Sequence, residues 1–167
     1  VEIDRGHVEF RMYRVWPGNA IAVRTTRKLP LNDWSQFAAT YDGSSSAAGL
    51  KLYLDGNELE TEVVRDHIKK RATGKGHHGG KLTIGQRFRD RGLAGALIDD
   101  VHVFGRALTP AEIMHSATGE PVQPSVEFFI SSIDEEAREA LKQLTSARKR
   151  LVMDEQAVMD IPAMEAM

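Results

Sequence analysis

Short stretches of alternating apolar and polar residues recur through the first hundred residues and constrain the fold more than any other feature. Residues 8–15 alternate with period two, which places Val8, Phe10 and Met12 on one face of a strand. Further strands are predicted at 21–23, 34–41, 50–54, 62–64, 82–84 and 98–104. Turns rich in glycine and serine separate them, without helical periodicity between. This pattern indicates an antiparallel β-sandwich or a barrel.

The strongest turn signal is the Asp55-Gly56 pair, which directly follows the predicted strand 50–54. An Asp-Gly pair suits a two-residue hairpin turn, because both positions then adopt positive φ angles. The sequence therefore predicts a tight hairpin here.

A helix is predicted to begin after Thr109, where the pattern changes from strands to helix. Thr109 supplies a hydroxyl N-cap, Pro110 suits the first helical position and Glu112 completes a capping box. This short helix is predicted to end by Gly119. The prolines that follow indicate an extended connector over residues 119–131.

A second capping box at 132–135 predicts an amphipathic helix over residues 132–153. Its apolar face comprises Ile133, Ala137, Ala140, Leu141, Leu144, Ala147 and Leu151. Such a face packs on the sandwich, on a second chain or on a domain that follows. We therefore predict a sandwich over 1–118, the connector over 119–131, and a helix with its tail over 132–167 that leads to a further domain.

Composition and charge exclude several functional classes. The formal net charge is −2, from 22 basic and 24 acidic residues, so the chain has no global field that attracts nucleic acid. The chain has no cysteine, which excludes thiolate chemistry and cysteine-ligated metals. No apolar run reaches the length of a membrane span, so we predict no membrane insertion.

Five motifs in order over residues 34–113 resemble those of the laminin-G/concanavalin A-like lectin and glucanase family. They are the tryptophan strand 34–43, the hairpin 50–56, the strand 82–85, the Asp-Asp strand 95–104 and the closing helix 107–113. The resemblance implies a mainly β, antiparallel jelly-roll sandwich with a short helix and a C-terminal amphipathic helix. It also implies a non-catalytic binding module, with carbohydrate as the ligand class.

Two further segments, 16–21 and 87–92, are similar to laminin-G-like modules of large planctomycete proteins that also carry a c-type cytochrome segment. This resemblance implies an extracytoplasmic location, periplasmic or at the cell surface, within a longer chain. The family's first strands are not found before Val1. We therefore expect a sandwich without its first strands, whose exposed edge or C-terminal helix pairs with a second copy or another protein surface.

Aromatic residues divide into a predicted core set and a candidate ligand-binding set. The spacing places Trp34, Tyr41, Tyr53 and Phe104 at inward-facing strand positions. Trp16, beside Pro17, is instead the candidate for an exposed aromatic. Sugar recognition requires an exposed aromatic with convergent polar groups. The predicted glycan-binding residues are therefore Trp16, Asn19 and Arg89.

The sequence requires no cofactor, and calcium is the one that its acids suggest, because that ion prefers oxygen ligands from loops. The candidate calcium ligands are Asp42, Asp99 and Asp100. The alternative for Asp42 is turn chemistry, because it precedes a glycine. Asp99 and Asp100 are adjacent on one predicted strand, so one of them should point inward.

The Glu2-Ile3-Asp4 stretch matches only part of a glycanase motif, and its incompleteness disfavours an enzyme. Some glycanases of this fold use Glu-Ile-Asp-x-x-Glu on one strand, and the third acid would fall at His7 here. Three functions stay open: a carbohydrate-binding module is favoured, a spacer or assembly domain is the alternative, and a glycoside hydrolase is the least supported.

Overall fold

The computed structural model describes residues 1–30, 32–72, 84–85, 92 and 95–158. Within them, two antiparallel sheets form. The first has the strand order β1-β2-β3-β7 and comprises β1 (Glu2–Asp4), β2 (His7–Val15), β3 (Asn19–Thr25) and β7 (Thr61–His67). The second has the order β4-β5-β6 and comprises β4 (Phe37–Tyr41), β5 (Leu50–Leu54) and β6 (Asn57–Glu58).

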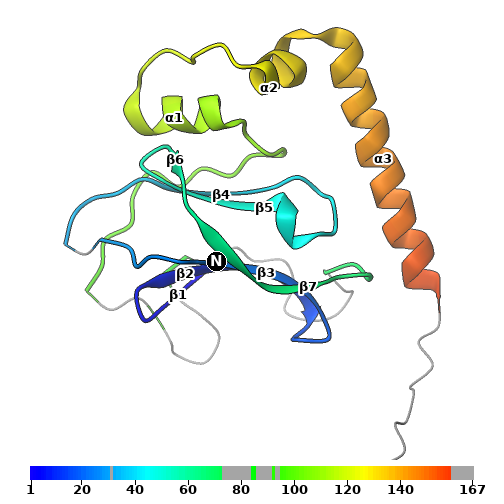
Figure 1. The fold of residues 1–167 in the computed structure, drawn as a ribbon, viewed down its shortest axis with the longest axis horizontal. Coiled ribbons are helices and arrows are strands. Elements are labelled where there is room, and N and C mark those ends of the chain that lie inside the picture. Colours follow the sequence, from blue (N-terminus) through cyan, green and yellow to red (C-terminus); the bar gives the residue numbers. More distant parts are fainter. Residues whose placement is uncertain (31, 73–83, 86–91, 93–94, 159–167) are drawn as a thin grey trace, which may run out of the picture.

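The two sheets face each other across one hydrophobic core, as Figure 1 shows. Val8, Ile21 and Val23 project from the four-stranded sheet, and Leu50 and Leu52 project from the other. All five are buried because alternate strand residues point to the same face. The predicted antiparallel β-sandwich is therefore confirmed.

The predicted hairpin connects β5 and β6 through Asp55 and Gly56, whose φ angles are +49° and +82°. Glycine adopts such an angle without steric strain. A Cβ at Gly56 would also lie 2.6 Å from the Sδ of Met114, so the missing side chain lets the helix of Met114 approach the turn.

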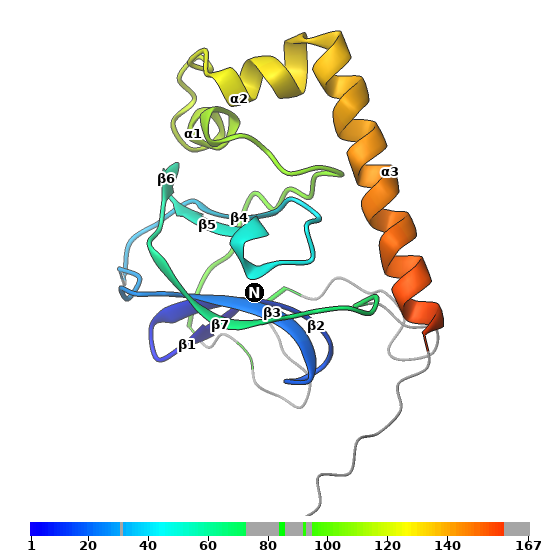
Figure 2. The ribbon, with the colours of Figure 1, turned by 45° about the vertical axis from the view of Figure 1, so that its right-hand side comes forward.

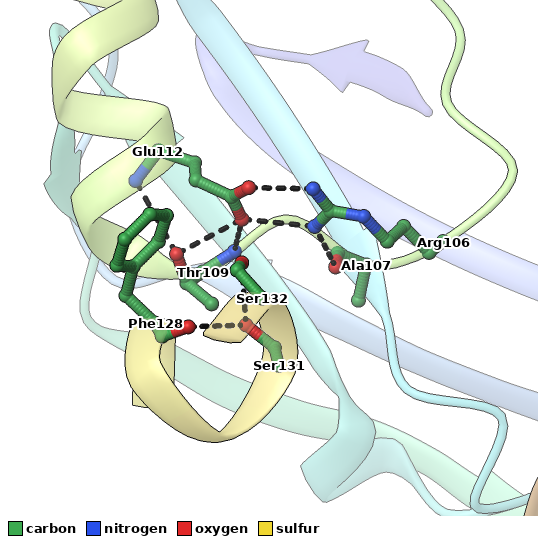
Figure 3. Close-up of polar contacts among 7 residues, drawn as sticks. All are labelled: Arg106, Ala107, Thr109, Glu112, Phe128, Ser131 and Ser132. Atoms are coloured by element: carbon green, nitrogen blue, oxygen red, sulfur yellow. Dashed lines mark hydrogen bonds and ion pairs between the residues drawn. The ribbon is translucent and has the colours of Figure 1, made fainter. Parts of the chain in front are cut away.

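That helix is α1 (Pro110–Thr118), and it begins and ends where the sequence predicts. The Thr109 hydroxyl accepts a hydrogen bond from the Glu112 amide, and the Glu112 carboxylate accepts one from the Thr109 amide. Figure 3 shows this capping box together with Arg106, whose guanidinium binds the same carboxylate from the preceding loop. Ile113 is buried, so α1 is fixed at its start and by its inner face.

The connector prediction for residues 119–131 is wrong in its second half. A short helix, α2 (Val126–Phe128), forms because the Ser125 hydroxyl caps it by accepting a hydrogen bond from the Phe128 amide. It continues as a single π-helical turn, η2 (Phe129–Ile133).

The long C-terminal helix is confirmed, but its start lies later than the capping box at 132–135 predicts. Helix α3 spans Glu135–Ala157, and its N-cap is Asp134, whose carboxylate accepts a hydrogen bond from the Ala137 amide. The π-helical turn already contains Ile133, so a helix cannot start at Ser132. Figures 1 and 2 show α3 running along one side of the two sheets.

Two predicted core aromatics are exposed. Trp34 is 69% exposed because β4 begins only at Phe37 and the period-two pattern does not extend back to it. Phe104 is 55% exposed because residues 98–104 form no strand, although a strand is predicted there. Tyr53 is buried, and Tyr41 packs against the core, as predicted. The predicted strand 82–84 lies outside the described residues except for Ile84, which is not in a strand.

Candidate functional site

The outer face of the four-stranded sheet carries a cluster of cationic and aromatic side chains. Ala22 pairs with Arg11 of β2 on one side and with Arg65 of β7 on the other. Ala20 pairs with Tyr13 in the same way. Directly paired residues share a face of an antiparallel sheet. The two buried alanines therefore form a floor between longer side chains.

Trp16 lies at the end of this face, in the turn between β2 and β3, after which a cis peptide bond leads to Pro17. The Arg11 guanidinium carbon lies 4.8 Å from the centre of the indole, and that of Arg65 lies 5.9 Å away. Tyr13 meets the indole edge-on at 6.1 Å between ring centres. These contacts hold the ring by cation–π and aromatic interactions. Trp16 nevertheless keeps 37% of its surface exposed, which confirms the predicted exposed aromatic.

Two carboxylates hold Arg11 in place beside the indole. Its guanidinium lies 2.5 Å from Glu9 Oε1 and 3.1 Å from Glu2 Oε2. The hydrogen bond to Glu9 is the largest cause that raises the pKa of Arg11 above its ordinary value. Glu9 is buried, and its charge-assisted hydrogen bond holds the Arg11 side chain beside the indole. We call Trp16, Tyr13, Arg11 and Arg65 the Trp16 cluster.

Asn19, a predicted glycan-binding residue, uses its side-chain amide within the fold. Its Oδ1 accepts hydrogen bonds from the amides of Lys69 and Lys70, each at 2.9 Å. Its Nδ2 donates to the carbonyl of Lys70, also at 2.9 Å. The side chain thus fastens the start of β3 to the chain that leaves β7. A surface hollow of about 350 Å³ lies beside it, lined by Arg14, Val15, Gly18, Asn19, His67, Lys69 and Lys70.

Arg89, the third predicted glycan-binding residue, lies outside the described residues. Trp16 therefore lies in the β2–β3 turn, and Asn19 directly follows that turn. The role of Arg89 stays a prediction.

The candidate calcium ligands lie in two different segments. Asp42 takes part in a turn, because its Oδ1 accepts a hydrogen bond of 2.9 Å from the Ser44 amide. Asp99 and Asp100 are both exposed, so the prediction that one points inward is wrong. The reason is that their segment is not a strand and has no inner face. Within the described ranges, no three acidic or histidine side chains gather into a metal-binding group.

A second hollow, of about 620 Å³, separates α3 from the sandwich. Its lining includes the cations Lys69, Arg71 and Lys149 and the apolar residues Ile68, Val152 and Met153. Arg148 spans it by donating to the Asp42 carbonyl at 2.8 Å. No helix in the described part of the chain is long and apolar enough to cross a membrane.

A family model described as the concanavalin A-like lectin/glucanases superfamily, Laminin_G_3, matches residues 2–114. The chain belongs to this superfamily. A comparison with curated proteins gave no significant match. A solved structure, that of residues 221–444 of an S-layer domain-containing protein from Clostridium thermocellum, is similar at 17% identity and a TM-score of 0.40. The likeness covers 71% of this chain and 66% of that one, so the chain spans just under two thirds of its length.

Arg11, Arg65 and Glu9 belong to the surroundings of Trp16 but were not among the predicted site residues. Period-two alternation already places Glu9, Arg11 and Tyr13 on the polar face of β2. This alternation could have identified Glu9, Arg11 and Tyr13. The closeness of Arg65 to Trp16, in contrast, depends on the register of β3 with β7.

Proposed function

We propose that this laminin-G-like module is a non-catalytic binding domain that recognises carbohydrate at the Trp16 cluster. The observation that carries the proposal is an indole that is held by two guanidiniums yet keeps about a third of its surface exposed. The superfamily, which includes lectins, makes a glycan the first ligand class to test.

The cluster has the chemistry that sugar binding requires. An aromatic ring buries the apolar face of a pyranose, and charged donors beside it bind the hydroxyl or carboxylate groups. Arg11 is fixed by Glu9 and Glu2, so little side-chain freedom is lost when a ligand binds. Arg65 supplies a second guanidinium on the same face.

Calcium enters the proposal only through the exposed acids Asp42, Asp99 and Asp100. Carboxylates at loops are ligands that calcium accepts. We propose that any calcium dependence of glycan binding arises at these acids rather than at the Trp16 cluster, whose two carboxylates already bind Arg11.

We also propose an extracytoplasmic location, periplasmic or at the cell surface, as part of a longer protein. Laminin-G-like domains are typical of extracellular modules, and glycans are abundant ligands there. The planctomycete origin suggested by residues 16–21 stays a prediction.

An assembly or spacer function is the second candidate, with a homo-oligomer formed through α3 or a sheet edge. One observation favours it: the apolar side chains of α3 are exposed, including Leu144 and Leu151 at 45% and 58%. Exposed apolar side chains on one helix face are typical of an interaction site.

A glycan-array screen tests the leading proposal, with the chain applied in calcium and in chelator. We expect reproducible binding that Trp16→Ala abolishes, because the stacking surface is then lost. Trp34→Ala is the matched control, since Trp34 is exposed but lies outside the cluster. A blank array from folded protein would contradict the carbohydrate proposal. Hydrolysis of a β-glucan by the chain would overturn the non-catalytic part.

A further inference from the structure

Helix α3 carries an exposed apolar stripe whose spacing is that of a coiled coil. We call its five residues the α3 seam: Ala137, Ala140, Leu144, Ala147 and Leu151. Successive members are four and three residues apart in alternation, which averages 3.5 residues. This spacing keeps a stripe facing one partner helix along its whole length.

The seam faces away from the sandwich. The side chains of α3 that line the hollow beside the sheets include Thr145, Arg148 and Val152. Of these, Arg148 and Val152 are partly buried, whereas Leu144 and Leu151 of the seam are exposed. The contact with the sandwich therefore leaves the seam uncovered. Isolated helices are marginal in water, and an amphipathic helix gains most of its stability from packing its apolar face.

We propose that the seam pairs with the seam of a second copy of this chain, with the two helices antiparallel. The inference rests on the assembly function above and is independent of glycan binding. In an antiparallel pair centred at residue 142, Ala137 meets Ala147 and Ala140 meets Leu144 of the second copy. Leu144 opposes the smaller Ala140 in both of its layers, which allows the helices to approach closely.

The charges beside the seam are complementary in this orientation. Glu136 and Arg150 flank the seam on the same side and are exposed. Antiparallel pairing places each beside the other in the second copy, and the two-fold axis makes this contact twice. Gln143 then lies beside its own symmetry mate, so no like charges meet along this edge.

The opposite orientation lacks this match. In a parallel pair, each residue of the seam meets its own counterpart, and the next position after Leu151 is Asp154. Two Asp154 carboxylates would then face each other across the interface, which is unfavourable. Glu136 would lie beside an apolar Leu141 instead of a cation, and Arg150 beside Glu155 would be the one complementary contact along this edge.

Charge reversal tests the pairing by analytical ultracentrifugation of the 167-residue chain. We expect the parent to form a dimer of twice 18.5 kDa. Glu136→Arg and Arg150→Glu should each weaken dimerisation about tenfold, because each change creates two repulsive contacts. The double variant Glu136→Arg/Arg150→Glu should restore the parental dissociation constant to within about twofold.

Glu135→Arg and Lys149→Glu are matched controls, because they make the same charge changes on the side of α3 opposite the seam. They should leave the dissociation constant unchanged. Circular dichroism of each variant shows whether α3 still folds. A dimer that ignores all the reversals would overturn the antiparallel pairing and leave the assembly function standing. A monomer at every concentration, or a dimer weakened equally by the controls, would overturn both. Neither result bears on the glycan array.

Discussion

The sandwich core and helix α3 contrast in how they use apolar side chains. Leu52 of β5 is 0% exposed and lies among the inward residues of both sheets. Leu144 of α3 has the same side chain and is 45% exposed. Leu52 therefore buries its apolar surface within the chain, whereas Leu144 leaves much of its apolar surface exposed.

The difference separates two kinds of sequence pattern. Period-two alternation in β2 and β5 produces inward faces that cover each other. The 3.5-residue pattern of α3 produces a face that the chain itself leaves uncovered. We infer that the sandwich supplies the scaffold for the Trp16 cluster and that α3 supplies a contact surface.

The largest expected effect comes from truncating the two leucines. Leu52→Ala should lower the free energy of unfolding by about 2–5 kcal/mol, because it removes a buried side chain and leaves a cavity. Leu144→Ala should change the unfolding of the dilute, monomeric chain by less than about 0.5 kcal/mol. Urea denaturation monitored by circular dichroism measures both. Equal losses of unfolding free energy in the two variants would contradict the contrast between the sandwich core and α3.

Asn19→Ala tests a polar tie within the sandwich. We expect a loss of about 0.5–1.5 kcal/mol in the free energy of unfolding, because the amides of Lys69 and Lys70 lose their acceptor and the Lys70 contact is partly buried. Arg148→Ala, which removes the tie between α3 and the Asp42 carbonyl, should cost less than about 1 kcal/mol because that contact is exposed. If Asn19→Ala leaves stability unchanged and abolishes glycan binding, the prediction that Asn19 binds the glycan is correct.

The attachment of α1 should weaken in acid. The hydrogen bond from Arg106 is the main cause that lowers the pKa of Glu112 from 4.5 to about 2. Because the folded-state pKa is depressed, the stabilisation is fully present above pH 4.5 and is lost as pH falls towards 2. Solvent screening of the half-exposed Arg106 limits it to on the order of 1–2 kcal/mol.

Glu112→Gln checks the origin of this pH dependence. The variant should be less stable at neutral pH and should show a flatter stability profile between pH 2 and 4.5. Glu127→Gln, at an exposed glutamate of α2, is the control. A parental profile in Glu112→Gln would place the acid sensitivity elsewhere.

Most of the fold could be predicted from local sequence signals. The Asp55-Gly56 turn and the Thr109 capping box specify their own geometry, because each depends on a few adjacent residues. Trp34 was misplaced because alternation alone does not locate the first residue of β4.

The candidate site was less accessible to prediction. Trp16 could be identified from its turn, but its partner Arg65 lies far along the chain and reaches it only through the pairing of β3 with β7. Asn19 has a polar side chain that suits a ligand or the backbone equally. Only the position of Lys69 and Lys70 in the structure shows that the Asn19 side chain binds the backbone.

Tryptophan fluorescence tests the central claim most directly. The chain has two tryptophans, so Trp34→Phe leaves Trp16 as the single emitter. Titration of this variant with an array-positive glycan should shift or quench the emission saturably, with the dissociation constant found by calorimetry, because the sugar covers the exposed part of the indole. Binding by calorimetry without any change in Trp16 emission would place the glycan elsewhere and contradict the account.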